Sequence, residues 1–277
     1  MNAGSHSNKP IALLIPVWNR QEKLDRALES VMPESDLVQV VVIDDGSSPP
    51  IRVGERGPPD VHLIRLPANQ GIARALNAGL DYAFARGFRY IARLDSDDSA
   101  ENGRFAKQLD FMNAHPSVGI CGSGYHECST DGRIRATVVP PCGNIGIRRG
   151  MNLSTTLWHP TVMIRASVAR TVGFYDPGFA CEDLDYFQRI LAVTEAANLP
   201  EALVRYEVGS ADALTGAGVR RRRVARDILR LKWRSRRPLD PLWWLGLVSA
   251  GTYYLGLNRL FAPLRGAVGQ WLARSPR

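Results

Sequence analysis

The sequence has few cysteines, and it lacks the apolar leader of a secreted protein. Its four cysteines, Cys121, Cys128, Cys142 and Cys181, show no C-x-x-C spacing, which argues against a zinc site and favours reduced thiols. Residues 1–10 are polar and contain no apolar run. We therefore expect no secretory signal and a protein body that stays in the cytoplasm.

Acidic residues are too few to balance the basic ones, so the chain carries a formal net charge of +8. The excess is local: residues 218–237 contain ten Arg or Lys and one Asp, a net +9, which leaves −1 for the rest of the chain. No nucleic-acid-reading motif accompanies this segment. The sequence thus predicts no nucleic-acid partner, and the basic character belongs to one segment alone.

Apolar runs alternate with helical patterns over the first hundred residues. The runs are 11–15, 38–43, 61–66 and 90–94. Together with the helical spacing at 71–86, this alternation predicts an α/β fold with a mostly parallel sheet, whose ligands bind beyond the carboxyl ends of the strands. Further along, two polar-apolar stretches flank Asp131-Gly132, which predicts a hairpin and a mixed sheet.

Acidic residues directly follow two of these apolar runs. Asp44 and Asp45 follow the second run, and Asp95, Asp97 and Asp98 follow the fourth. Three carboxylates within four residues repel one another unless a cation shares them, so we interpret the second cluster as a divalent-metal site. An N-cap and a turn are the alternative, since Asp and Ser favour both.

Four short motifs carry a resemblance to a known family. They are I-P-V-W-N-R at 15–20, D-D-G-S at 44–47, N-Q-G-I-A-R-A-L-N-A-G at 69–79 and L-D-S-D-D at 94–98. In this order and at this spacing, they resemble the family 2 glycosyltransferases with the GT-A fold, over residues 10–210. The resemblance implies a Rossmann-like mixed sheet flanked by helices and a nucleotide-diphosphate sugar donor, which we take to be a UDP-sugar.

By that resemblance, one set of residues binds the nucleotide sugar. The set comprises Pro16, Asn19, Asp44, Asn69, Gly71, Arg74, Asn77 and Asp95. The D-x-D pair, Asp95 and Asp97, would touch the ribose and hold a divalent metal, Mn²⁺ or Mg²⁺. The residue types also allow a turn at Asp44, a loop and helix cap at 69–71, and a solvated helix face for Arg74.

A second set of motifs resembles the acceptor side of the family's site. The stretch 158–165 matches the family's H-P-x-x-M-x-R strand. By the resemblance Asp183 is the general base, with Glu182 beside it at a helix start. Trp158 and His159 would line the acceptor pocket. Helix capping is the alternative for the two acids, and core packing is the alternative for Trp158 and His159.

The sequence departs from the family pattern in two places. The run at 205–210 lacks the His that can complete the metal shell, so Glu207, water or the nucleotide itself would supply the remaining ligand. Gln188-Arg189 is not followed by the signature of processive members, and we expect one addition per binding event. Asp185 lies two residues beyond the predicted base and is a reserve candidate for its role.

The tail contains no clear membrane span. The uncharged apolar run at 241–257 is about seventeen residues long, at the lower limit for a spanning helix, and it follows the basic amphipathic pattern at 218–237. We therefore predict an interfacial anchor that meets anionic lipid on the cytoplasmic face of the inner membrane. A helical hairpin packed on the body, or on a second protomer of a homo-oligomer, is the alternative.

The chain thus divides into a flexible N-terminus at 1–9, a GT-A domain at 10–215 and a helical, membrane-associating region at 216–277. We expect metal-assisted, inverting transfer of a sugar to a hydroxyl of a lipid-linked or cell-envelope glycan acceptor. A nucleotidyltransferase is one alternative, but no Gly-rich phosphate loop follows the first strand, at Pro16. A catalytically silent membrane scaffold is the other.

Overall fold

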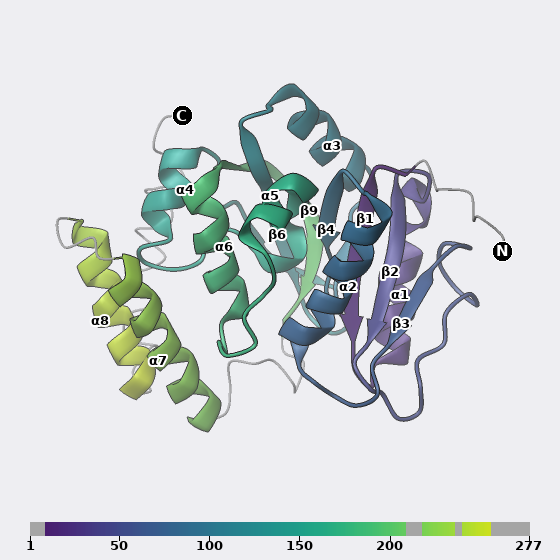
Figure 1. Cartoon of the computed structure of the whole chain (residues 1–277), viewed down its shortest axis with the longest axis horizontal. Coiled ribbons are helices and arrows are strands. Elements are labelled where there is room, and N and C mark those ends of the chain that lie inside the picture. The colour runs from purple at the N-terminus through teal and green to yellow at the C-terminus, as the bar shows by residue number, and fades with distance from the viewer. Residues whose placement is uncertain (1–8, 209–217, 236–239, 256–277) are drawn as a thin grey trace.

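The computed structural model describes residues 9–208, 218–235 and 240–255 (Figure 1). Within these residues the chain forms a nine-stranded mixed sheet flanked by helices. The strands are β1 (Ile11–Val17), β2 (Val38–Asp44), β3 (His62–Arg65), β4 (Tyr90–Arg93), β5 (Ser99–Ala100), β6 (Val118–Cys128), β7 (Ile134–Val138), β8 (Met163–Arg165) and β9 (Glu195–Glu207). Their order is β3-β2-β1-β4-β8-β6-β9-β5, with β7 beside β6.

Helices connect most of these strands. They are α1 (Gln21–Val31), α2 (Ile72–Arg86), α3 (Arg104–Ala114), α4 (Asn144–Gly150), α5 (Ala166–Val172), α6 (Glu182–Val193), α7 (Gly218–Ser235) and α8 (Pro241–Leu255). Short 3₁₀ turns, η1 (Met32–Glu34) and η2 (His159–Thr161), follow α1 and precede β8. Strands and helices alternate as the apolar runs predict, which confirms the α/β fold class.

The first four strands are parallel. β1 pairs with both β2 and β4, and β2 pairs with β3. In this register Val17 lies opposite Asp44, and Asp44 lies opposite Arg65. Because the carboxyl ends of parallel strands meet at one edge, the loops that carry Asn19 and Asp95 leave the sheet on the same side.

The sheet becomes mixed after β4, as predicted. β8 runs antiparallel to β4 and to β6, and β6 and β7 form the hairpin predicted around Asp131. β9 is parallel to β6 along most of its length and antiparallel to β5 near its end. The end of β9 therefore returns to the segment that follows Asp98, beside the acidic cluster.

Two cores cover the two faces of the sheet. Leu13 and Ile15 of β1 belong to a core closed by α1 and α3, whereas Ala12 and Leu14 belong to a core closed by α2, α5 and α6. Successive side chains of a strand point to opposite faces. Since both faces are covered, the strands are continuous apolar runs rather than alternating ones.

α7 and α8 lie side by side at one end of the molecule, next to α6 (Figure 1). Asp227 of α7 accepts a hydrogen bond from the Ala180 N–H at 2.9 Å, and the buried Lys232 donates to the Asn152 carbonyl. The Trp243 indole of α8 donates to the Lys232 carbonyl at 3.1 Å. The described part of the tail is thus a helical hairpin packed on the body. Among the described residues no helix combines the length and the apolar character needed to cross a membrane.

Two further expectations lie outside the described residues, and one can be compared with the structure. The flexible N-terminus at 1–9, apart from Lys9, and the boundary at 215–216 fall outside the described residues. The four cysteines are free thiols.

Candidate active site

Asn19 joins the loops that follow β1 and β2. Its N–H donates to Ser47 Oγ at 2.8 Å, and its Oδ1 accepts from the Ser48 N–H at 2.8 Å. Asn19 has φ of +55°, a left-handed conformation that asparagine tolerates better than most residues. Pro16 is the second-last residue of β1, and Trp18 is 51% exposed. The loop predicted to border the base is therefore fixed in place, with an aromatic ring accessible at its rim.

Asp44 is fully buried at the end of β2. Its oxygens accept from the Ser47 N–H at 2.9 Å, the Ile51 N–H at 3.2 Å and Arg65 Nε at 3.2 Å. Burial alone would raise the pKa of Asp44, but the Ser47 and Ile51 hydrogen bonds and the Arg65 charge outweigh it and hold the pKa below its ordinary value. This geometry favours the turn-forming role, and a contact of Asp44 with the nucleotide stays a prediction.

Asp45 holds the loop that precedes α2. Its two oxygens accept from the Gln70 N–H at 2.8 Å and the Gly71 N–H at 2.9 Å. Gly71 caps α2 with φ of +87°, which favours glycine. Asn69 and Arg74 are exposed on this rim, and Arg74 has no ion pair among the described residues. Its guanidinium is therefore available to a phosphate.

Asn77 of α2 contacts the loop before α6. Its Nδ2 donates to the Tyr175 carbonyl at 2.9 Å, and its Oδ1 accepts from the Tyr175 N–H at 2.8 Å. The side-chain amide thus links α2 to the segment that leads into α6. Its predicted place beside the nucleotide stays a prediction.

Asp95, Asp97 and Asp98 follow β4 in a tight turn. Asp97 Oδ2 accepts from Arg20 Nη1 at 2.6 Å, and Lys23 Nζ lies 4.0 Å from the same oxygen. Burial, and then the charge of Asp95, raises the pKa of Asp97, against the opposing charges of Arg20 and Lys23. The Arg20 contact confirms that the ends of β1 and β4 meet at one edge of the sheet.

Asp98 is buried with one oxygen unsatisfied. Its Oδ1 accepts from the Glu207 N–H at 2.9 Å, whereas its Oδ2 has no hydrogen-bond partner. Burial, and then the charges of Asp95 and Asp97, raises the pKa of Asp98 well above its ordinary value. An orphaned carboxylate oxygen beside two further carboxylates fits a divalent cation with oxygen ligands. In the part of the chain that the structure describes, no group of three or more His, Cys, Asp or Glu side chains is placed to hold a metal ion.

Basic side chains of α1 stand beside this cluster. Lys23 Nζ lies 2.9 Å from Glu207 Oε1, and Arg26 Nη2 lies 3.4 Å from Glu207 Oε2. Glu207, one of the alternatives for the remaining metal ligand, is therefore engaged by protein cations in this structure.

Arg93 is a site residue that sequence reasoning missed. It is 1% exposed, and its guanidinium donates to Asp95 Oδ1 at 2.6 Å, the Leu14 carbonyl at 2.9 Å and His159 Nε2 at 3.3 Å. It therefore places a fixed positive charge between Asp95 and His159. A basic residue that ends an apolar run directly before an acidic cluster is the signal that would have found it.

His159 is buried between Arg93 and Tyr175. Its Nε2 lies 3.3 Å from Arg93 Nε and 3.0 Å from the Tyr175 hydroxyl. Because Arg93 Nε only donates, Nε2 must accept, and the imidazole is neutral. Burial, and then the Arg93 charge, lowers the pKa of His159 well below its ordinary value. The geometry favours the hydrogen-bonded core role for His159, and its place in an acceptor pocket stays a prediction.

Trp158 belongs to an aromatic trio beside the acidic cluster. It stacks on Tyr125, with ring centroids 4.9 Å apart, and meets Tyr206 edge to face at 5.3 Å. Burial raises the pKa of Tyr206 to about 12, and the charges of Asp98 and Asp95 add to this effect. Packing therefore accounts for Trp158, although its indole N–H is buried without a partner.

The two acids that begin α6 differ in accessibility. Glu182 is 6% exposed, whereas Asp183 is partly exposed and accepts from the Leu184 N–H at 2.8 Å. Burial raises the pKa of both; the charge of Asp183 is the next cause for Glu182. Asp95 raises both pKa values further and Arg93 lowers them. Carboxylates far apart in sequence therefore lie within electrostatic reach in one site.

Asp185, the reserve candidate, faces α7 instead. Its Oδ2 lies 2.9 Å from Arg189 Nε, and its Oδ1 lies 3.7 Å from Arg234 Nη1. These ion pairs give Asp185 a structural role at the base of the hairpin.

Solved structures share this arrangement of strands and helices. S. aureus TarS 1-349 in complex with UDP-GlcNAc has a TM-score of 0.59 and 14% identity, and the match covers 95% of this chain and 88% of that one. The mannosyltransferase PcManGT from Pyrobaculum calidifontis, in complex with GDP-Man and Mn²⁺, has a TM-score of 0.59 and 16% identity, covering 99% of this chain and 78% of that one. The fold is that of the GT-A transferases.

Proteins of similar sequence identify the family to which the chain belongs. The family model "Glycosyl transferase family 2" matches residues 12–173. The amylovoran biosynthesis glycosyltransferase AmsE of Erwinia amylovora is 29% identical over 207 residues, 72% of this chain and 76% of that protein. The putative glycosyltransferase EpsE of Bacillus subtilis is 27% identical over 210 residues, 72% of this chain and 73% of that protein. The chain belongs to glycosyl transferase family 2 and is a glycosyltransferase.

Proposed function

We propose that this glycosyltransferase moves a sugar from a nucleotide-diphosphate sugar, with a UDP-sugar as the first choice, to a hydroxyl of a lipid-linked or cell-envelope glycan acceptor. The observation that carries the proposal is the Arg93–Asp95 contact of 2.6 Å together with the raised pKa of Asp183, to which Asp95 contributes. The UDP-GlcNAc and GDP-Man named for the two structural neighbours support a nucleotide-sugar donor. The name of AmsE supports a role in polysaccharide biosynthesis.

The donor would lie along the edge where β1, β2 and β4 end. The loop of Pro16 and Asn19 would border the base, and the exposed Arg74 would meet the diphosphate. Asp95 and Asp97 would hold Mn²⁺ or Mg²⁺, which when bound neutralises the charge that grows on the leaving diphosphate. The raised pKa values of Asp97 and Asp98 support this assignment, because a shared cation would relieve their repulsion.

Asp183 would take the proton from the attacking hydroxyl, which is the step that inverting transfer requires of the protein. One of its oxygens accepts from the Leu184 N–H, so the other is the proton acceptor. Its raised pKa makes the carboxylate a better base than an ordinary Asp. Glu182, buried beside it, would stay protonated, so the first turn of α6 would not gain a second negative charge next to Asp183.

The hairpin of α7 and α8 would bring the protein to the cytoplasmic face of the inner membrane as a peripheral protein. Trp244 and Val248 are 54% and 49% exposed on α8, and aromatic rings favour the headgroup level of a bilayer. Anionic lipid would complement the arginines of α7. A homo-oligomer that covers the same apolar residues would place them at a protein interface instead, and the mass of the protein in detergent-free solution separates the two arrangements.

The test is donor hydrolysis. Purified protein with Mn²⁺ and a panel of UDP-, GDP- and dTDP-sugars should release nucleotide slowly without an acceptor, and EDTA should stop the release. The anomeric configuration of the released sugar, followed by NMR, should be inverted. Absence of release with every donor would favour a silent scaffold.

A further inference from the structure

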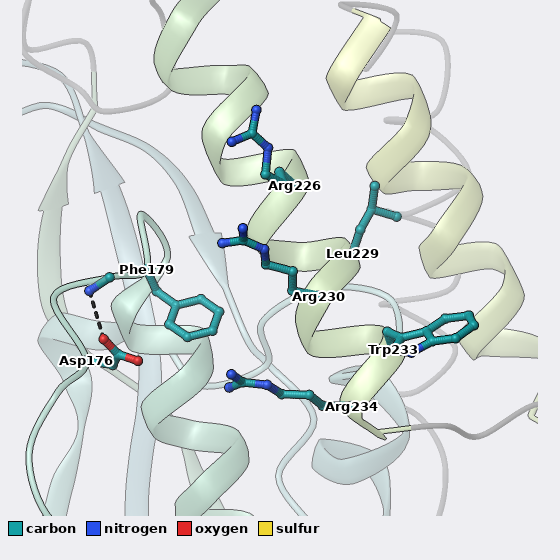
Figure 2. A pocket seen from close by; sticks show the side chains of 8 residues that line it. Asp176, Phe179, Arg226, Leu229, Arg230, Trp233 and Arg234 are labelled. Carbon is teal, nitrogen blue, oxygen red and sulfur yellow. Dashed lines mark hydrogen bonds between the residues drawn. The ribbon is translucent and has the colours of Figure 1, made fainter.

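A groove of about 630 Å³ lies between α7 and the loop that leads into α6 (Figure 2). We call it the α7 groove, and its lining includes Phe179, Arg226, Leu229, Arg230, Trp233 and Arg234. The three arginines are spaced four residues apart, so they form a column along one side of the helix. Figure 2 shows this column facing Phe179 across the groove, with the Arg234 guanidinium 5.2 Å from the centre of the ring.

The arginines of the groove have unused hydrogen-bonding capacity. Arg230 contacts the buried Asp227 at 3.2 Å, and Arg234 lies 3.7 Å from the buried Asp185. Both side chains remain more than half exposed, at 60% and 66%. Arg226 is exposed and has no ion pair among the described residues. Each guanidinium carries five N–H donors, so most of the donors face solvent.

The negative groups near the groove do not cancel this charge. Asp227 is nearly buried, and its second oxygen accepts from the Ala180 N–H at 2.9 Å. Asp176, on the opposite wall, accepts from the Gly178 N–H at 2.8 Å. Each of these carboxylates accepts from a backbone N–H, and Asp227 also pairs with Arg230, while the guanidinium groups point into the groove (Figure 2). The groove therefore suits an anion with several oxygens.

Exposed apolar side chains lie at the groove and on the neighbouring helix α8. Trp233 is 68% exposed and Leu229 is 37% exposed in the lining of the groove, and Trp244 of α8 is 54% exposed. Exposed aromatic and aliphatic side chains beside a cationic groove match a ligand that joins a charged head to an apolar chain.

The groove adjoins the proposed base. Phe179 is four residues before Asp183, so their Cα atoms lie within about 14 Å of one another. α7 contacts the residues around Asp183 directly: Asp227 accepts from the Ala180 N–H at 2.9 Å, and Arg234 lies 3.7 Å from Asp185. The groove therefore lies next to the segment that carries Asp183.

We propose that the α7 groove binds the phosphate or diphosphate ester of an amphiphilic acceptor and directs the acceptor sugar toward Asp183. The inference rests on the proposed function and names its acceptor class: a sugar joined through phosphate to a long apolar alcohol. The apolar chain leaves along Trp233 and α8. Arg226, Arg230 and Arg234 recognise the phosphate oxygens.

The test uses a soluble head-group probe with the full chain. Calorimetry with decyl diphosphate, decanol and inorganic diphosphate, each below its aggregation limit, measures head and chain separately. Arg226→Glu reverses a charge that has no ion pair in the described residues, and Arg226→Gln only removes it. The matched control is Arg223→Glu, which makes the same change at an exposed site of the same helix outside the groove.

We expect decyl diphosphate to bind the wild type at least tenfold more tightly than decanol. Arg226→Glu should raise the Kd about tenfold and Arg226→Gln several-fold, whereas Arg223→Glu should change it less than twofold. Equal losses in the Arg226 and Arg223 variants would overturn the proposal. So would equal binding of decanol, or binding of phosphatidylglycerol vesicles without binding of the monomeric probe, which would identify bilayer lipid as the occupant.

The same protein samples separate this inference from the proposed function. If a donor sugar releases its nucleotide but the Arg226 variants bind the probe as the Arg223 variant does, the acceptor site in the groove is refuted. The transferase assignment then stands. If probe binding depends on Arg226 but no donor releases its nucleotide, the transferase assignment is refuted. The groove then stands as a phosphate-ester site.

Discussion

Arg93 Nη2 and Asp95 Oδ1 lie 2.6 Å apart at the end of a strand whose other residues are apolar. The guanidinium also holds the Leu14 carbonyl and His159. This side chain thus links the acidic cluster to the central strand and to His159 in a single set of hydrogen bonds.

Arg93→Lys should therefore destabilise the protein, although it keeps the charge. An ammonium group cannot make the forked contacts of a buried guanidinium, and the broken network should cost about 3 kcal/mol or more of the free energy of unfolding. Urea denaturation measures the loss. Arg89→Lys, the same change at an exposed site just before β4, should cost less than about 0.5 kcal/mol; equal costs would show that Arg93 carries no special load.

Substitutions of two carboxylates, Asp183 and Asp97, should affect different steps: one the transfer reaction and the other nucleotide binding. Asp183→Asn should lower transfer by about 10³-fold while nucleotide binding in the presence of Mn²⁺ stays within twofold. Asp97→Ala should weaken that binding, because it removes a carboxylate proposed to hold the metal. Calorimetry with UDP and Mn²⁺ distinguishes the two variants, and a reversal of the pattern would exchange their roles.

Arg20 should compete with the metal for Asp97. Its Nη1 lies 2.6 Å from Asp97 Oδ2, so Arg20→Ala removes a positive charge from the cluster and should tighten binding of free Mn²⁺ about fivefold. Electron paramagnetic resonance of unbound Mn²⁺ gives the affinity without nucleotide.

Arg56→Ala is the matched control for this measurement. Arg56 pairs with Glu29 at 3.1 Å on the surface, away from the acidic cluster, and at physiological salt its removal should change Mn²⁺ affinity less than twofold. Weaker Mn²⁺ binding in Arg20→Ala would contradict competition and would make Arg20 a supporting member of the metal site.

Lys232 should make stability depend on pH. It is 5% exposed, and burial lowers its pKa to about 8, with Asp240 opposing the shift. The lysine of the unfolded chain titrates near 10.4, so between about pH 8 and 10.4 the unfolded chain binds the extra proton and stability rises with pH. The full effect is about 3 kcal/mol.

Lys232→Met should remove this rise and should be more stable than the wild type at pH 7, where the wild type keeps a buried charge. Urea denaturation at pH 7 and pH 9.5 measures both effects. Lys107→Met, at an exposed lysine of α3, should keep the pH dependence of the wild type; a Lys232→Met variant with an unchanged pH dependence would refute the assignment.

The sequence predicts the parallel half of the sheet well, because its strands are buried on both faces and are therefore unbroken apolar runs. The same topology explains why the acidic clusters after β2 and β4 could be placed at one edge. β5 escaped prediction, since Ser99–Ala100 is too short for any pattern and forms only because Arg205 and Val204 of β9 lie opposite.

The main features that the sequence did not predict are the buried basic residues. Hydropathy assigns Arg93 and Arg104 to the surface, yet both are buried, and Arg104 Nη2 donates to the Arg93 carbonyl at 2.7 Å. Lys232 is a similar case at the foot of the hairpin. The partners that allow such burial are distant in sequence, so local pattern cannot supply them.

β4 pairs with β1 on one side and with β8 on the other. The residues proposed for the donor and for the acceptor therefore lie on one continuous sheet, and the described residues show no division into two lobes that could move apart. We therefore expect the proposed donor to enter, and the nucleotide to leave, through rearrangement of the edge loops, so that turnover responds to substitutions in those loops more than to changes that stiffen the sheet.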